Sequence, residues 1–373
     1  MNTETLLVEL GTEELPPKAL KSLGLAFRDG ITAGLAQREL EFGDAHWYAT
    51  PRRLAVLVDA VQLQAAEKTV EALGPPVDRA RDEEGNWTPA AAGFARKQGV
   101  EPESLETIDT PKGPRLGLRS TVAGARAADC LHEIIRGSLQ SLPIPKRMRW
   151  GASREEFVRP VHWVVAMLGA STVAGDILGL PAGNTTRGHR FHSSGSIELS
   201  NPAEYESALA EAKVVAGFEQ RQQMIRDQVE VEASALQASA VIDQDLLDEV
   251  TALVEWPVAL TGSFEERFLE VPQEALVSSM KEHQKYFHLV DDKGRLKPNF
   301  ITIANIESKD PIQVIAGNER VIRPRLADAA FFFETDKKTP LAERVTQLGD
   351  IVFQQKLGTL ADKTRRLEAL AQA

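Results

Sequence analysis

The stretch TLLVELGTEELPP, residues 5–17, sets the fold of the N-terminal region. Its first half has the apolar, β-type character of a strand, and GTEELPP supplies turn residues before a candidate helix at about residues 18–40. Apolar side chains recur in that helix at spacings of three and four: Leu20, Leu23, Phe27, Ile31 and Leu35. One face of the helix therefore belongs to a core, and a strand leading into a packed helix indicates mixed α and β structure.

Length and composition narrow the class of protein. A chain of 373 residues is longer than one core usually supports, so two or three domains are expected. The only cysteine, Cys130, has no partner and is expected to be a buried thiol in a reducing cytoplasm. No apolar run approaches the roughly 20 residues that cross a bilayer, and the N-terminus lacks the order of a secretory signal, so a soluble cytoplasmic protein without membrane contact is expected.

The first predicted domain spans residues 1–142. RRLAVLVDAVQL and RLGLRSTV are expected to form strands, and residues 125–142 a helix. Residues 70–114, rich in Gly, Pro and Ala, are expected to form an irregular excursion with one short helix. The PIP sequence at residues 143–145 marks the boundary.

The second predicted domain spans residues 143–335. FVRPVHWVVAML and TVAGDILGL have the pattern of paired, largely buried strands, and residues 285–306 predict a hairpin around the turn at Asp291–Gly294. Helices are expected at NPAEYESALAEA, where Asn201 is a plausible N-cap, at EQRQQMIRDQVEVEASAL and from about Gly317.

Residues 336–373, with a helix expected from about Leu341, are predicted to be the start of a helical domain that the chain leaves incomplete.

Motifs for several common chemistries are missing. The chain has no phosphate loop, no G-x-G-x-x-G after a strand, no H-E-x-x-H and no G-x-S-x-G. His189 and His192 have a metal-like spacing, but hydroxyls and arginines surround them instead of further ligands. No metal is therefore predicted. Packing of one histidine and a polar or RNA contact of the other are both left open.

The sequence PIPKRMRWG, residues 143–151, contradicts the charge of the whole chain. The chain carries 54 acidic and 43 basic side chains, a formal charge of −11, yet Lys146, Arg147 and Arg149 gather beside Trp150. An acidic protein can contact nucleic acid only through such local patches, because a uniform negative field repels phosphates. The cluster is interpreted either as an RNA-facing patch or as a hinge in which the arginines stack on Trp150 or pair with carboxylates.

Two further patches are candidates for RNA binding. Arg187 and Arg190 lie among hydroxyls and glycine in NTTRGHRFHSSG, which suits phosphate or ribose unless both arginines pair with carboxylates elsewhere. The third patch consists of Arg320, Arg323 and Arg325, in GNERVIRPRLADAAFFFETD. The three phenylalanines that follow, residues 331–333, are predicted to be core and not a stacking platform for bases.

These residues carry a resemblance to a known family. The blocks, in chain order, are LLVELGTEELPPKAL, ATPRRLAV, LPIPKRMRWG, FVRPVHW, RGHRFH, LLDEVTALVEWPVAL, HQKYF, NFITIANI, GNERVIRPRLADAAFFFETD and FQQKLGTLADKTRR. Together they resemble the N-terminal portion of the beta subunit of bacterial heterotetrameric glycine-tRNA ligase. The resemblance implies an α+β, multidomain fold of mixed sheets with packed helices. A module similar to the B3/B4 module of the phenylalanine enzyme would be followed by the start of an all-α HD-like domain, and the family's C-terminal anticodon-binding domain is expected to be absent from these residues.

The resemblance also implies a division of labour in an alpha2beta2 tetramer. A separate alpha subunit would carry the aminoacylation site and use ATP and Mg²⁺, while this chain would bind tRNA(Gly), hold no cofactor and not contact DNA. The sequence agrees, because neither the class II F-R-x-E and G-x-G-x-x-R patterns nor the class I signals occur in it. Two alternatives stay open: a hydrolytic module that edits mischarged tRNA, and a purely architectural subunit.

Overall fold

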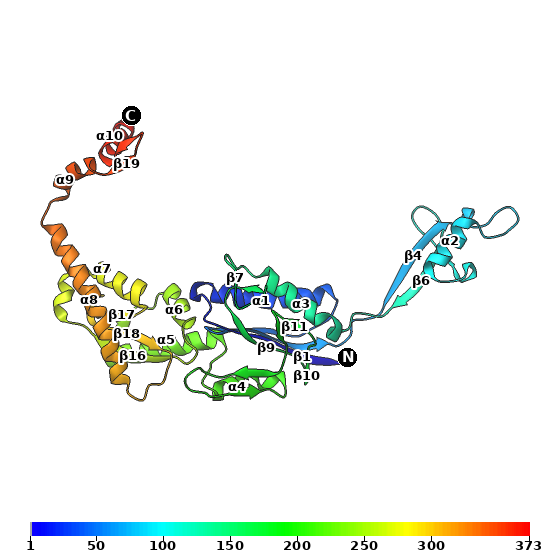
Figure 1. The fold of residues 1–373 in the computed structure, drawn as a ribbon, viewed down its shortest axis with the longest axis horizontal. Helices are drawn as coiled ribbons and strands as arrows, with labels where there is room; N and C mark the ends of the chain where they lie inside the picture. Colours follow the sequence, from blue (N-terminus) through cyan, green and yellow to red (C-terminus); the bar gives the residue numbers. More distant parts are fainter. Residues whose placement is uncertain (1) are drawn as a thin grey trace. The chain divides into compact units, whose positions relative to one another are not determined.

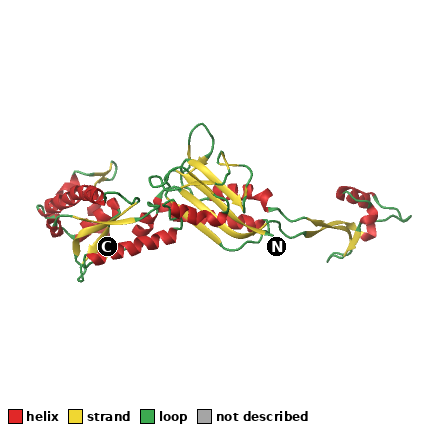
Figure 2. Ribbon diagram, turned by 90° about the horizontal axis from the view of Figure 1, so that it is seen from below, coloured by secondary structure: helices red, strands yellow, loops and turns green. Residues whose placement is uncertain are grey.

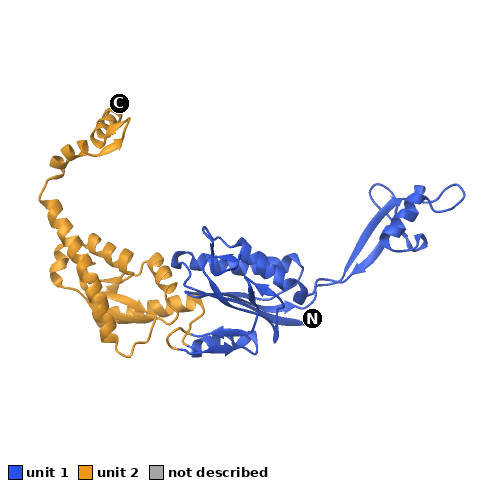
Figure 3. Cartoon of the chain, viewed as in Figure 1, with its two compact units in different colours: residues 1–188, 193–212 blue, residues 189–192, 213–373 orange. Residues whose placement is uncertain are grey.

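The computed structural model describes residues 2–373 and divides them into two compact units (Figure 3). Unit 1 consists of residues 1–188 and 193–212, and unit 2 of residues 189–192 and 213–373. The architecture is α+β and multidomain, with antiparallel sheets and packed helices, which confirms the predicted fold class. Among residues 2–373, no helix combines the length and the apolar character needed to cross a membrane.

A five-stranded antiparallel sheet is the centre of unit 1, in the order β10-β9-β1-β3-β2 (Figure 1). Its strands are β1 (Thr3–Thr12), β2 (Ala45–Thr50), β3 (Arg53–Gln62), β9 (Val161–Leu168) and β10 (Ser171–Thr172). The central strand β1 pairs with β3 on one side and with β9 on the other. Both neighbours of the TLLVEL strand thus come from distant parts of the chain.

Two helices, α1 (Pro17–Gln37) and α3 (Ala127–Ser141), lie side by side on one face of this sheet. The predicted apolar stripe of α1, from Leu20 to Leu35, is buried. Gly30 allows the close approach of the two helices, because a Cβ there would overlap the Ser138 hydroxyl. Cys130 on α3 is buried, as predicted, and burial raises the pKa of its thiol.

Unit 1 also contains several short strands and one short helix outside the central sheet. They are β7 (Met148–Arg149), β8 (Glu156–Phe157), β11 (Asp176–Ile177), β12 (Leu180–Pro181), β13 (Thr185–Arg187), β14 (Ser196–Glu198) and α4 (Tyr205–Glu211). Asn201 accepts a hydrogen bond from the Ala203 N–H just before α4, which confirms its predicted capping role. Figure 1 shows α4 on the side of the sheet opposite α1 and α3.

The predicted irregular excursion is more regular than its composition indicates. It forms a three-stranded antiparallel sheet of β4 (Lys68–Pro76), β6 (Arg115–Val122) and β5 (Glu106–Ile108), with the predicted short helix as α2 (Pro89–Gln98). Its core is small and centres on Ala80, Ala91 and Leu116. The prediction missed β4 because Gly and Pro, which usually mark turns, occupy its last three positions.

Unit 2 has a four-stranded antiparallel sheet in the order β15-β17-β18-β16. Its elements are α5 (Phe218–Ala235), β15 (Ser239–Ala240), α6 (Gln244–Thr251), β16 (Val258–Ser263), α7 (Gln273–Ser278), β17 (Phe287–Val290), β18 (Leu296–Ala304) and α8 (Pro311–Lys337) (Figure 1). Figure 2 draws the helices of the chain in red and the strands in yellow. Successive side chains of β18 point to opposite faces, so Ile301 packs with α5 and α6 while Phe300 packs with α8. The hairpin predicted around Asp291 is confirmed as β17–β18.

The last part of the chain departs from its prediction. The apolar repeat from Leu341 predicted a helix, but α9 covers only Leu341–Arg344 and is followed by a 3₁₀ turn and a short hairpin of β19 (Val352–Gln354) and β20 (Gly358–Thr359). A new helix, α10 (Leu360–Gln372), then begins at a capping box of Thr359 and Asp362. The assignment of residues 336–373 to an all-α HD-like domain remains a prediction.

The compact units also divide the chain at a different place from the predicted boundary at Pro143. The strand β9 pairs with β1, which keeps residues 143–188 in the same unit as the N-terminal strand. A Pro-x-Pro sequence limits the local backbone but gives no information about which strands pair across the boundary.

Candidate nucleic-acid interface

The centre of unit 1 contains a buried charged network that the sequence analysis did not identify. Glu9 of β1 is 0% exposed and its carboxylate accepts hydrogen bonds from Trp163, Thr186 and Tyr205, of which the Thr186 bond is 2.6 Å long. Arg53 of β3, which is 1% exposed, forms an ion pair with Glu9 at 3.2 Å. A buried charge is stable when it is paired and fully hydrogen-bonded, and Glu9 meets both conditions.

Burial fixes the protonation state of one donor in this network. It raises the pKa of the Tyr205 phenol well above its usual range, and the charge of Glu9 adds to the effect. The phenol therefore stays protonated and donates a hydrogen bond to the Glu9 carboxylate. Tyr205 also packs edge-on against Tyr48, with ring centroids 5.4 Å apart.

The buried network holds the backbone of Arg187, one of the predicted RNA-binding residues. Arg53 donates a hydrogen bond of 2.8 Å to the backbone carbonyl of Arg187, and Arg187 follows the buried Thr186 at the end of β13. The Arg187 guanidinium lies over the Trp163 ring, 5.2 Å from its centroid. The side chain is exposed and, within residues 2–373, makes no ion pair or side-chain hydrogen bond. Its predicted alternative, pairing with a carboxylate, does not occur in the described chain.

Arg190 belongs to the other compact unit, although it is three residues further along the chain. It is exposed and, in the described part of the chain, has no ion-pair partner. The neighbouring His189 is 1% exposed, and its Nδ1 accepts hydrogen bonds from the backbone N–H groups of Phe191 and His192. The packing role predicted for one of the two histidines is confirmed for His189.

His192 makes a different contact. Its Nε2 accepts a hydrogen bond of 2.9 Å from the backbone N–H of Glu307, and burial, followed by the nearby His189, lowers its pKa. In residues 2–373, no group of three or more His, Cys, Asp or Glu side chains has the arrangement of a metal site.

The cations of residues 146–149 have different environments. Arg147 donates hydrogen bonds to the carbonyls of Leu139 and Gln140 and so caps the C-terminal end of α3. Arg149 pairs with Glu156 across the β7–β8 ladder at 2.5 Å, which is the carboxylate pairing that the hinge interpretation describes. Lys146 is exposed and has no partner among the described residues.

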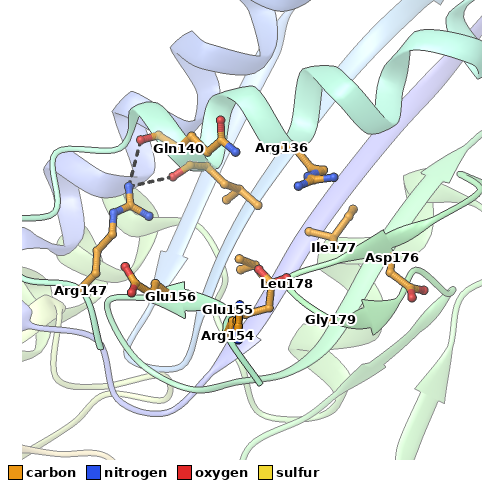
Figure 4. Close-up of a pocket in the computed structure, with 11 residues that line it drawn as sticks. Arg136, Gln140, Arg147, Arg154, Glu155, Glu156, Asp176, Ile177, Leu178 and Gly179 are labelled. Carbon is orange, nitrogen blue, oxygen red and sulfur yellow. Dashed lines mark hydrogen bonds between the residues drawn. The ribbon is translucent and has the colours of Figure 1, made fainter. Parts of the chain in front are cut away.

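Arg147 also lines a hollow of about 600 Å³ in unit 1 (Figure 4). Arg136 and Gln140 of α3 lie on one side, and Arg154 and Glu155, from the loop before β8, lie on the other. Further lining residues are Leu139, Glu156, Asp176, Ile177, Leu178 and Gly179. The sequence analysis did not single out Arg136 or Arg154, because neither belongs to a conspicuous basic run.

The third predicted patch lies on α8. Arg320 and Arg325 are exposed, whereas Arg323 pairs with Glu265 at 2.7 Å. Phe333 packs partly into the core of unit 2, but Phe331 and Phe332 are each 64% exposed. The prediction that the three phenylalanines are core is therefore wrong for two of them in this chain. Consecutive helical residues point about 100° apart, so only one of three adjacent rings can face the buried stripe of Ile322 and Leu326.

The fold and these side chains define an α+β, multidomain protein in which several exposed cations have no carboxylate partner among residues 2–373. Comparison with known proteins gives the family. Residues 6–373 match the family described as glycyl-tRNA synthetase beta subunit. The chain belongs to this family.

Curated relatives agree over the full length of the chain. It is 55% identical to the glycine-tRNA ligase beta subunits of Chromohalobacter salexigens and Hahella chejuensis, and 52% identical to that of Pseudomonas aeruginosa. Each match covers 100% of this chain and 54% of the relative. The chain thus spans about half the length of the curated relatives it matches.

Proposed function

We propose that this chain acts as the tRNA-binding, non-adenylating part of a glycine-tRNA ligase, in complex with a separate alpha subunit. The family membership supports the ligase role, and the absence of the class I and class II ATP signatures in the sequence supports a division of labour. In this proposal the alpha subunit uses ATP and Mg²⁺, the assembly is an alpha2beta2 tetramer in the cytoplasm, and this chain contacts tRNA(Gly).

The environment of Arg187 is the observation that carries the proposal. Within residues 2–373 Arg187 has no carboxylate partner; instead it lies on Trp163, and its backbone is held by the buried Arg53. This arrangement restricts the side chain before any ligand arrives, so less entropy is lost when it binds a phosphate. Lys146 and Arg190 are likewise exposed and unpaired within residues 2–373.

The test compares two arginines of equal charge and different environment. In the full-length complex, Arg187→Ala is expected to weaken tRNA binding and to reduce the slope of log affinity against log salt by up to about one, because one phosphate contact is lost. Arg149→Ala is the matched control: it removes an arginine already paired with Glu156, and the slope should change little. Glycine activation, followed by pyrophosphate exchange, should stay normal in both variants.

Two results would contradict the proposal. Equal slopes for Arg187→Ala and the unmodified complex, with Lys146→Ala and Arg190→Ala also unchanged, would leave no role for these cations in RNA binding. A complex that charges tRNA without any crosslink from tRNA to this chain would favour a purely architectural subunit.

A further inference from the structure

We propose that the hollow between α3, the β7–β8 loop and the β11–β12 turn is a binding site for one phosphorylated ribonucleotide. This inference rests on the proposed RNA-binding function and assigns it one particular subsite. The same side chains could recognise a free nucleotide, because it carries the same phosphate, ribose and base. Of the basic residues predicted from sequence to bind RNA, the hollow contains only Arg147, because it is assembled from residues 136–179 in unit 1.

The cations of the hollow suit a phosphate. Arg136, Arg147 and Arg154 all line it, and Arg147 uses only its Nη2 in the hydrogen bonds to the α3 carbonyls. Arg136 and Arg154 are exposed and form no ion pair within the described chain, although Glu155 and Asp176 line the same space. Glu156, which pairs with Arg149, also lines the hollow. Guanidinium groups that line one space and form no ion pair are available to bind an anion with two or more oxygens.

Two carboxylates of the hollow, Glu155 and Asp176, disfavour a bare anion and favour a ligand that also carries hydroxyls. The side chains of Glu155 and Asp176 have no hydrogen-bond partner within residues 2–373. They would repel a free inorganic anion but accept hydrogen bonds from the hydroxyls of a ribose. The combination of arginine and free carboxylate in one hollow therefore matches a sugar phosphate better than phosphate alone.

The apolar lining completes the match, and one of its residues has an unusual backbone. Ile177 is fully buried, and Leu178 lies beside it with φ of 52°. Leu178 and Gly179 (φ of 76°) form the two-residue turn between β11 and β12. Such turns favour Asn-Gly, since a leucine is strained in the left-handed region. Leu178 nevertheless occupies this turn and lines the hollow, where a base would have an apolar surface to contact.

The test uses the full-length subunit without its partner and AMP as the probe, followed by titration calorimetry. AMP should bind saturably, and adenosine and inorganic phosphate should each bind at least about tenfold more weakly, because each lacks one half of the recognised group. Arg136→Ala should weaken AMP binding by about tenfold or more. Arg96→Ala, which removes an exposed arginine of α2 outside the hollow, should leave it unchanged.

A second variant separates binding from folding. Leu178→Asn supplies the residue that the turn prefers, so the melting temperature should stay equal or rise, while AMP binding should weaken by several-fold. No saturable AMP binding, or AMP binding unaffected by both Arg136→Ala and Leu178→Asn, would overturn the proposal. These measurements use no tRNA, so AMP binding can be absent even if the chain binds tRNA. Equally, AMP can bind even if the chain does not bind tRNA.

Competition identifies the source of the nucleotide. If tRNA displaces AMP, and Arg136→Ala weakens both ligands, the hollow takes a nucleotide of the bound RNA. If tRNA and AMP bind together, with only AMP affected by Arg136→Ala, the hollow is a site for free nucleotides. Either result supports a ribonucleotide site in this place.

Discussion

Replacing Glu9 by glutamine should destabilise the central sheet of unit 1 strongly, although the two side chains have nearly the same shape. The variant keeps an acceptor for Trp163 and Thr186 but removes the negative charge of Glu9, which pairs with the Arg53 guanidinium, itself only 1% exposed. Removing one partner of a buried ion pair costs about 3–5 kcal/mol, and glutamine, which preserves the packing, should fall at the lower end, about 3 kcal/mol.

Hydrogen–deuterium exchange of peptides from β1 and β13 measures this loss locally, which matters because a multidomain chain has no single unfolding free energy. A loss of about 3 kcal/mol should accelerate exchange in these peptides by about a hundredfold. Glu4→Gln is the matched control, since Glu4 lies on the same strand and is exposed, and it should change stability by less than about 0.5 kcal/mol.

The double variant Glu9→Gln with Arg53→Met tests whether the charges are coupled. Each single change removes one member of the Glu9–Arg53 ion pair and keeps the other, whereas the double change removes both, so its cost should be about 2–3 kcal/mol smaller than the sum of the single costs. Additive costs, or exchange in Glu9→Gln no faster than in Glu4→Gln, would refute the reasoning that the buried pair holds β1 and β13 together.

Three shorter predictions concern other parts of the chain. Gly11→Ala should destabilise unit 1 by about 1–3 kcal/mol, measured by hydrogen–deuterium exchange of β1 peptides, because its Cβ would overlap the Trp163 ring. Burial lowers the pKa of His288 in unit 2, so folding disfavours protonation of this side chain. The stability of the fold should therefore decrease as the pH drops below about 6.5, the pKa of histidine in an unfolded chain. In thermal melts between pH 7.5 and about 5.5, His288→Gln should show a smaller decrease. The buried Cys130 thiol, whose pKa is raised, should react with iodoacetamide at pH 8 only after denaturant is added.

Local patterns predicted the elements well. The apolar stripe of α1, the turn at Asp291 and the cap at Asn201 each depend on residues a few positions apart, and the structure confirms all three. The apolar repeat after Leu341 failed because it reports only where apolar side chains recur, and the capping box at Thr359 starts a new helix inside it. The missed strand β4 failed for a similar reason, since sheet pairing overrode its turn-forming composition.

The sequence by itself determined the family, the α+β class and the positions of the basic runs. These properties depend on the order of residues along the chain and on patterns that repeat within a few residues. Only the tertiary structure decided which cations are free. Arg149 and Arg187 look alike in sequence, but the β7–β8 ladder gives Arg149 a carboxylate, while β13 places Arg187 on Trp163. The Glu9–Arg53 pair and the hollow at Arg136 were hidden for the same physical reason: their members are far apart in the chain, and only strand pairing and helix packing bring them within a few ångströms.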